Sequence, residues 1–130
     1  MPAILLSLSL ICCSGRNSTS LKQTSGSDSS KSLTYEERQG RQLYKKYCAV
    51  CHGEEGKGDG FNAFNLDPKP RNFTDSIYMS ALSDERIVET ISQGGRGVNR
   101  SMLMPTWGGR LKREEIKYVV SYIRRFSYSE

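Results

Sequence analysis

The side chains with the clearest chemical potential stand together in a run of five residues, Cys48-Ala49-Val50-Cys51-His52. Two thiols three positions apart are followed at once by an imidazole, and His52 is the only histidine in the chain. This C-x-x-C-H spacing is typical of covalent haem attachment. The thiols reach two vinyl groups on one porphyrin edge and form thioether bonds, and the imidazole binds the iron. The sequence therefore predicts that Cys48, Cys51 and His52 hold one covalent haem c.

Two other kinds of site use the same thiol spacing. A thioredoxin-like redox pair is expected between a strand and a helix, whereas this pair follows a predicted helix and precedes a Gly-rich loop. A structural zinc site needs about four ligands, usually from a second Cys or His pair. No such pair lies near, because the remaining thiols, Cys12 and Cys13, stand close to the start of the chain. The spacing therefore favours haem.

An iron held by His52 has a sixth position, and no second histidine can fill it. Met79, Met102 and Met104 are the candidates, ahead of any Lys or Tyr. Pro105 favours an extended backbone at Met104, so the loop can present that thioether at a defined place. The alternative is that these methionines fill gaps in the core. Opposite a haem iron, Met104 is the preferred ligand, and Met/His ligation suits an electron carrier.

Three helices are predicted to position these side chains. Thr34 and Glu37 have the spacing of a capping box, and the helix they open runs into Cys48 with an apolar face. The remaining elements follow from their caps, glycines and apolar spacing: an irregular loop over 53–75, a helix from Ser83 to Gly94-Gly95, a loop over 96–110, and a last helix from about Arg113 to Phe126 with Ile116, Val119, Val120 and Ile123 on its buried face.

This pattern predicts an all-α fold of three to four short helices with little or no sheet. A domain of roughly 95 residues with two long loops has a thin core. A bound haem would supply the missing apolar core, and the loops would wrap it.

The N-terminal region reads as a targeting segment followed by a linker. Residues 3–13 are almost wholly apolar but too short to span a bilayer, which takes about 20 residues, so residues 1–13 suit an export signal. Leu10-Ile11-Cys12-Cys13 looks like the lipobox of bacterial lipoproteins, with Cys13 as the lipidated residue and Cys12 as the alternative. No Lys or Arg precedes the apolar run, so a plain cleaved signal or an uncleaved anchor stays open. Residues 14–34 are rich in Ser, Thr and Gly and predict a flexible linker to the domain at 35–130.

Residues 36–130 resemble the single-domain class I cytochromes c, particularly the small bacterial, cytochrome c6-like kind. The matching motifs are Gly40-Arg41-Gln42-Leu43-Tyr44 before Cys48-Ala49-Val50-Cys51-His52-Gly53, then Gly56-Lys57-Gly58-Asp59-Gly60, and finally Met104-Pro105-Thr106-Trp107-Gly108-Gly109.

The resemblance implies the cytochrome c fold, with the first and last helices crossing where Gly40 meets Tyr122. It implies Met104 as the axial ligand, the Pro68 carbonyl as the group that orients His52, and Arg71 and Trp107 as partners of the haem propionates. Lys112 departs from the family pattern, because a Ser or Thr cap often precedes the last helix.

These features predict an electron carrier outside the cytoplasm rather than an enzyme, because no distal histidine is available for catalysis. The net charge of +5 is modest and lacks a dense Lys/Arg tract, so no nucleic-acid partner is expected. Arg41, Lys45 and Lys46 are candidates to guide docking to an acidic redox partner, or they form an ordinary solvated helix face. The expected partners are a membrane oxidoreductase or another carrier. The chain is expected to be a monomer on the periplasmic or cell-surface side, attached to a membrane through its lipid. A haem-based sensor or a subunit of a respiratory complex is the competing possibility.

Overall fold

The computed structural model describes residues 32–128. The predicted export signal and lipidation site, and almost all of the predicted linker, lie outside these residues. Within them the fold is helical and contains no strand, and none of its helices is long and apolar enough to cross a membrane. The elements in chain order are α1 (Tyr35–Tyr47), α2 (Ala49–His52), the 3-10 helix η1 (Phe61–Asn65), α3 (Ser76–Ser80), α4 (Asp84–Gly97) and α5 (Arg113–Ser127).

The predicted all-α class is confirmed, although the described residues form five α-helices and not three to four. The additional ones, α2 and α3, have only four and five residues. Apolar periodicity cannot be read over so short a span. The three long helices begin where the sequence predicts them, although a capping residue was expected for α1 and α4 and not for α5.

Helix α1 begins at the predicted capping box. The Thr34 hydroxyl accepts from the Glu37 backbone N–H at 3.2 Å, and the Glu37 carboxylate accepts from the Thr34 N–H at 2.7 Å. The helix buries Gly40 and Tyr44 and ends at Cys48, whose N–H donates to the Tyr44 carbonyl at 2.8 Å. The C-x-x-C-H motif therefore begins at the end of α1.

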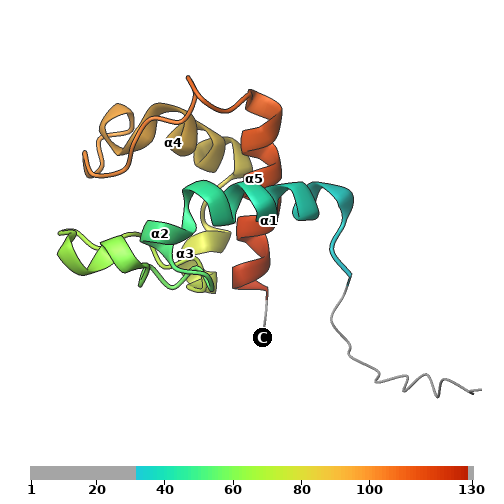
Figure 1. Cartoon of the computed structure of the whole chain (residues 1–130), viewed down its shortest axis with the longest axis horizontal. Helices are drawn as coiled ribbons and strands as arrows, with labels where there is room; N and C mark the ends of the chain where they lie inside the picture. Colours follow the sequence, from blue (N-terminus) through green and yellow to red (C-terminus); the bar gives the residue numbers. More distant parts are fainter. Residues whose placement is uncertain (1–31, 129–130) are drawn as a thin grey trace, which may run out of the picture. The chain divides into compact units, whose positions relative to one another are not determined.

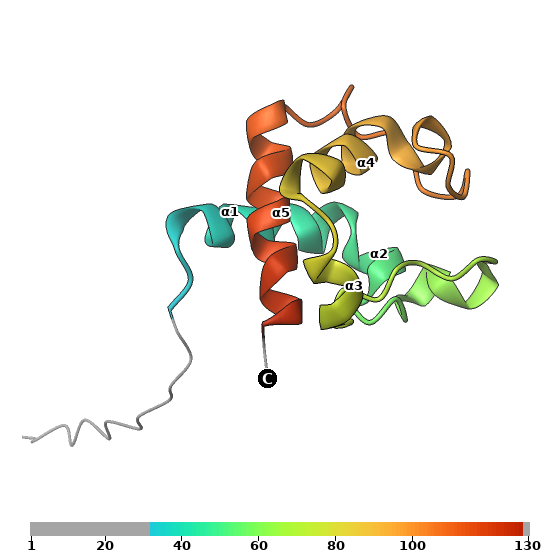
Figure 2. The same cartoon turned by 180° about the vertical axis from the view of Figure 1, so that it is seen from behind.

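Helices α1 and α5 cross, as the resemblance implied, and both views show α5 lying across α1 (Figures 1 and 2). The absence of a side chain at Gly40 is what allows the close approach. A Cβ atom there would collide with the Tyr118 carbonyl of α5 and lie 3.0 Å from the Tyr122 Cβ. Beside the crossing, the Tyr44 and Tyr122 rings meet edge to face with centroids 5.4 Å apart.

Helix α4 begins at the predicted cap, because the Ser83 hydroxyl accepts from the Arg86 N–H at 3.1 Å. Its regular part ends at Gly94, whose φ of 69° breaks the helix, and one more turn reaches Gly97. Helix α5 begins after Lys112, where the Glu115 carboxylate accepts from the Lys112 N–H at 2.8 Å. This bond gives the Lys112 N–H at the start of the helix an acceptor, although the position is not occupied by Ser or Thr. The four predicted apolar residues of α5 are all buried.

Arg124 joins α5 to the connection between α3 and α4. Its guanidinium donates to the Met79 and Leu82 carbonyls and, at 2.8 Å, to the Asp84 carboxylate. Met79 is 1% exposed and belongs to the central apolar cluster. It therefore serves as a core residue.

Candidate functional site

The two thiols of the motif are held on consecutive turns of backbone. The N–H groups of Cys51 and His52 both donate to the Cys48 carbonyl, at 3.1 and 2.9 Å. Both cysteines are free and half-buried. Burial raises the pKa of Cys48 to about 12, and the neighbouring Cys51 adds to that shift. A thiol with this pKa is protonated at neutral pH.

His52 is oriented by a backbone carbonyl, and this geometry fixes its tautomer. Its Nδ1 lies 3.2 Å from the Arg71 carbonyl. Since a carbonyl can only accept, Nδ1 carries the proton and Nε2 keeps its lone pair free for a metal. Burial lowers the pKa of His52, and the hydrogen bond to Arg71 opposes that shift. The Phe73 ring stacks on the imidazole with centroids 4.6 Å apart.

The residue predicted to orient His52 was Pro68, and that prediction is wrong: the carbonyl belongs to Arg71, three residues later. The reason is that residues 70–73 pass close to residues 56–58, which follow His52 in the chain. The Phe73 N–H donates to the Gly56 carbonyl at 2.7 Å, and the Gly58 N–H donates to the His52 carbonyl at 2.8 Å. Gly58 has a φ of 77°, and a Cβ atom there would collide with the Pro70 carbonyl. These contacts bring residues 70–73 against His52, so the nearby carbonyl is that of Arg71.

The segment that carries Met104 is bound to the end of α4. The Gly95, Trp107 and Gly108 N–H groups pair with the Met104, Ile91 and Ser92 carbonyls at 3.0–3.1 Å. Gly94 makes the approach possible, because a Cβ atom there would lie 2.8 Å from the Met104 carbonyl oxygen. The backbone of Met104 is thus held by a helix end.

The methionines differ in their surroundings. Met104 is half-buried and packs against the central apolar cluster, whereas Met102 is 71% exposed.

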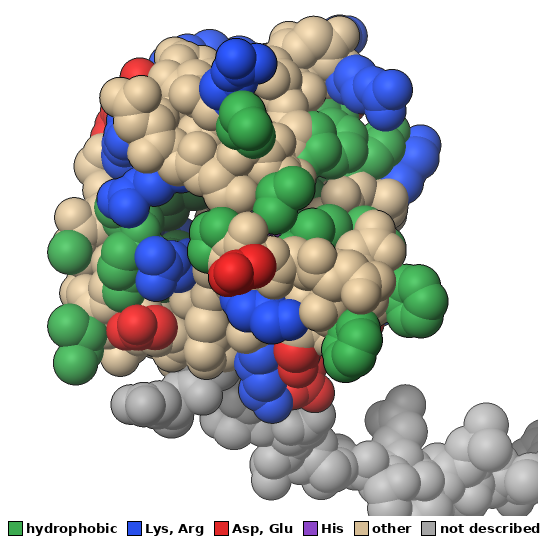
Figure 3. All heavy atoms as spheres, turned by 90° about the vertical axis from the view of Figure 1, so that its left-hand side faces the viewer, with side chains coloured by type: hydrophobic (Ala, Val, Ile, Leu, Met, Phe, Trp, Pro, Cys, Tyr) green, Lys and Arg blue, Asp and Glu red, His purple; other side chains and the backbone are tan. Residues whose placement is uncertain are grey.

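The motif and the Met104 segment belong to elements that lie apart in the fold. In Figures 1 and 2, α2, which contains Cys51 and His52, lies below the end of α4 and the loop that follows it. Figure 3 shows the side of the molecule that lies at the left in Figure 1. The surface there has a hollow between its upper and lower parts, and hydrophobic side chains lie around the hollow. An apolar planar group between an imidazole and a thioether needs this arrangement of segments.

Arg71 and Trp107, the predicted propionate partners, both lie close to the motif. The Trp107 ring is tilted against Tyr47, the residue before Cys48, with centroids 5.2 Å apart. The Arg71 guanidinium lies over the Tyr78 ring, 3.8 Å from its centroid. Their roles toward propionates stay predictions. Phe73 and Tyr78 escaped the sequence analysis, because neither belongs to a recognisable motif.

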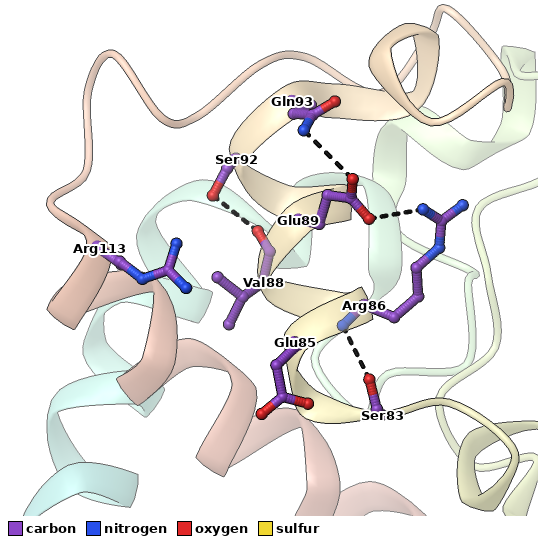
Figure 4. A pocket seen from close by; sticks show the side chains of 8 residues that line it. All are labelled: Ser83, Glu85, Arg86, Val88, Glu89, Ser92, Gln93 and Arg113. Carbon is purple, nitrogen blue, oxygen red and sulfur yellow. Dashed lines mark hydrogen bonds and ion pairs between the residues drawn. The ribbon is translucent and has the colours of Figure 1, made fainter.

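A separate pocket of about 460 Å³ lies along α4 and is lined by Ser83, Glu85, Arg86, Val88, Glu89, Ser92, Gln93 and Arg113 (Figure 4). Several of its polar groups already pair with one another. Arg86 binds Glu89 at 2.7 Å, and the Ser92 hydroxyl donates to the Val88 carbonyl at 2.7 Å. It contains neither thiol nor imidazole, so it is no alternative to the hollow.

The residues present fit a covalently bound haem. Two thiols and an imidazole with a free Nε2 stand together at the end of α1 and on α2, and a half-buried thioether lies on the segment that follows α4. This is the donor set of a Met/His-ligated haem.

Comparison with known proteins agrees with this chemistry. Residues 36–123 match the family model described as "Cytochrome C oxidase, cbb3-type, subunit III". The chain is 35% identical to the cbb3-type cytochrome c oxidase subunit FixP of Bradyrhizobium diazoefficiens over 89 residues, which cover 68% of this chain and 27% of that protein. It is 32% identical to subunit CcoP of Cereibacter sphaeroides over 101 residues, covering 78% of this chain and 30% of that protein. The match therefore spans less than a third of these relatives' length.

Solved structures give the same result. The KustC0563 c-type cytochrome superposes with a TM-score of 0.54 at 32% identity, covering 67% of this chain and 95% of that one. A chain of the Kuenenia stuttgartiensis reducing HAO-like protein complex Kustc0457/Kustc0458 superposes with a TM-score of 0.56 at 38% identity, covering 73% of this chain and 43% of that one. The predictions of a cytochrome c fold and of an electron-carrying cytochrome domain are confirmed, and the chain belongs to the family of c-type cytochromes described by cbb3-type cytochrome c oxidase subunit III.

Proposed function

We propose that this protein is a single-haem electron carrier whose haem c is attached through Cys48 and Cys51 and ligated by His52 and Met104. The observation that carries the proposal is the Nδ1 contact of His52 with the Arg71 carbonyl at 3.2 Å. It leaves Nε2 as the ligand atom in a side chain that already stands beside two free thiols. The bound haem supplies reversible one-electron chemistry.

The protein's own residues would make this site a carrier and not an enzyme. Cys48 and Cys51 would prevent loss of the cofactor, and His52 and Met104 would both bind the iron, which would leave no place on it for a substrate. His52 is the only histidine in the chain, so no second imidazole can act as an acid or base. Trp107 and Arg71 are the proposed contacts of the propionates.

The proposed location is outside the cytoplasm, on a membrane. The apolar run over residues 3–13 and the Cys12-Cys13 pair support export and lipidation, with Cys13 as the modified residue. A linker of about 21 residues would give the domain a typical reach of about 25 Å. The proposed partners are redox proteins, either a membrane oxidoreductase or another electron carrier.

A second candidate is a permanent subunit of a terminal oxidase, because FixP and CcoP are named as subunits of cbb3-type cytochrome c oxidases. Purification of the natively expressed chain under mild detergent separates the two possibilities. A stable complex with oxidase subunits would favour the subunit. Recovery as the isolated chain would favour a carrier.

The test of the carrier compares three proteins made with haem-maturation machinery: the parent, Met104→Ala and Met102→Ala. We expect haem to remain attached after denaturation in all three. We expect only Met104→Ala to bind carbon monoxide when reduced, because it alone opens the sixth position. Met102→Ala is the matched control, since Met102 is exposed and two residues away. Ligand binding by Met102→Ala alone would move the ligand to Met102, and absence of attached haem in the parent would refute the cytochrome.

A further inference from the structure

Arg71 contacts two functional neighbours through different parts of the residue. Its main-chain carbonyl accepts the Nδ1 proton of His52 at 3.2 Å. Its guanidinium lies over the ring of Tyr78, 3.8 Å from the centroid. One residue therefore connects the predicted iron ligand to a ring in α3.

The backbone on either side of Arg71 is held by contacts with residues 56–58. The Phe73 N–H donates to the Gly56 carbonyl at 2.7 Å, and the Pro70 carbonyl packs against Gly58. Arg71 is exposed, and among the described residues its guanidinium has no carboxylate partner. Among the described residues, half-buried Tyr78 is therefore the contact that orders the Arg71 side chain, and it holds the guanidinium from the side of α3 whether or not a propionate also binds it.

A guanidinium stacked on an aromatic ring has a preferred plane and distance. Because the allowed side-chain rotamers depend on φ and ψ, fixing the guanidinium favours some backbone angles of Arg71 over others, and those angles set the direction of its carbonyl. The direction of the carbonyl in turn determines how well it accepts the His52 proton.

We propose that Tyr78 is a positioning residue for His52, and that it acts by holding the Arg71 side chain so that the Arg71 carbonyl faces Nδ1. This inference rests on the proposed function, because His52 is taken as the iron ligand. A carbonyl on Nδ1–H makes the imidazole a more basic ligand, which favours oxidised iron. Loosening Arg71 therefore favours the reduced state.

The experiment uses the full haem-loaded chain with Tyr78→Leu, Tyr78→Phe, Arg71→Leu and the double variant Arg71→Leu/Tyr78→Leu. Each protein is poised at the midpoint potential of the parent, and the ratio of reduced to oxidised haem is read from the visible spectrum. We expect Tyr78→Leu to raise this ratio by about twofold to fivefold, the range that an exposed cation–π contact allows. Tyr78→Phe keeps the ring and should behave as the parent.

The double variant tests the route. In the Arg71→Leu background, Tyr78→Leu should cause no further change in the ratio, because the guanidinium it supports is already gone. A second readout is the exchange of the His52 Nδ1 proton with solvent in NMR spectra. It should be faster in Tyr78→Leu and unchanged in Tyr78→Phe.

Three outcomes would overturn the proposal. One is that Tyr78→Leu has the same ratio of reduced to oxidised haem and the same His52 Nδ1 exchange rate as the parent. Another is a change in the ratio of reduced to oxidised haem that is as large in Tyr78→Phe as in Tyr78→Leu, because the effect would then come from the Tyr78 hydroxyl and not from its ring. The third is a Tyr78→Leu effect that persists in the Arg71→Leu background. If Tyr78→Leu fails to fold, a parental Nδ1 exchange rate in Arg71→Leu overturns the proposal by itself. Failure of the proposed function gives a different result, the absence of attached haem in the parent.

Discussion

Tyr44 is a polar side chain at the centre of the apolar core. It is fully buried, and its hydroxyl donates to the Gly53 carbonyl at 2.7 Å. Gly53 directly follows His52, so this bond ties the end of the haem-attachment motif to α1. Burial raises the pKa of Tyr44, and nearby acidic groups, Cys48 first among them, add to the shift.

Tyr44→Phe should lower the free energy of unfolding at pH 7 by about 1–3 kcal/mol, because the buried Gly53 carbonyl loses its donor. It should also change the pH dependence. An unfolded tyrosine loses its proton near pH 10 while folded Tyr44 keeps it, so the folded state binds more protons and stability falls as pH rises above about 10. Urea unfolding between pH 8 and 11 should show a shallower fall in Tyr44→Phe.

The control for this prediction is Tyr128→Phe, because Tyr128 is 76% exposed. It should match the parent at every pH. Equal slopes for the parent and Tyr44→Phe would show that Tyr44 does not control the alkaline loss of stability.

At the residue scale, the sequence predicts functional side chains that stand close together in the chain or beside a proline. Cys48, Cys51 and His52 stand within five residues, and Pro105 points to Met104. The orienting carbonyl could not be predicted, because any residue has one. The carbonyl belongs to Arg71 because residues 70–73 lie against residues 56–58. A single sequence does not show which parts of two loops come into contact.

At the scale of elements, the crossing of α1 and α5 depends on one missing side chain. A Cβ atom on residue 40 would collide with a backbone carbonyl, which cannot move aside as a flexible side chain could. The helices must separate or shift for any larger residue to fit.

Gly40→Ala should therefore lower the free energy of unfolding by about 1–3 kcal/mol, the usual cost of overpacking, even though alanine favours a helix over glycine. Thermal or urea unfolding of the haem-loaded protein measures the loss. Gly109→Ala is the matched control, because a Cβ atom at Gly109 meets nothing within 4 Å. A Gly40→Ala protein as stable as Gly109→Ala would mean that the crossing tolerates a methyl group.

Element prediction succeeded where a cap and an apolar stripe coincide. Thr34 with Glu37, and Ser83 before Ile87, mark starts that the structure confirms. It failed for α3, where Asp75 caps a helix of five residues through the Tyr78 N–H at 2.9 Å. Tertiary contacts, such as the donation of Arg124 to the Met79 carbonyl, stabilise this turn. Gly94 ends the regular part of α4 as predicted, but one further turn follows because the chain must reach the Met104 segment.

At the scale of the whole molecule, positive charge is concentrated in one stretch. Residues 94–113 contain no Asp or Glu and carry five cations, all exposed: Arg96, Arg100, Arg110, Lys112 and Arg113. This stretch includes the Met104 segment. A negative reaction partner approaching that side would be attracted.

The haem-loaded protein should therefore react faster with an anionic oxidant, hexacyanoferrate(III), as ionic strength falls, and slower with a cationic one, hexaammineruthenium(III). Stopped-flow rates between 10 and 500 mM salt measure this. Arg96→Gln/Arg100→Gln should reduce the salt dependence with the anion. Lys117→Gln should not, because Lys117 lies on α5, where it pairs with Glu114 at 3.6 Å. Rates independent of salt for both oxidants would argue against electrostatic steering.

The position of the C-x-x-C-H motif at the end of α1 also bears on the order of events during biosynthesis. A chain is made from its N-terminus, so α1 and the motif emerge long before α5, which α1 must cross to bury Tyr44. Until then α1 is a helix of 13 residues, too short to be stable alone. As long as α5 has not packed against α1, Cys48 and Cys51 therefore stand on an open peptide to which haem-attaching enzymes have access.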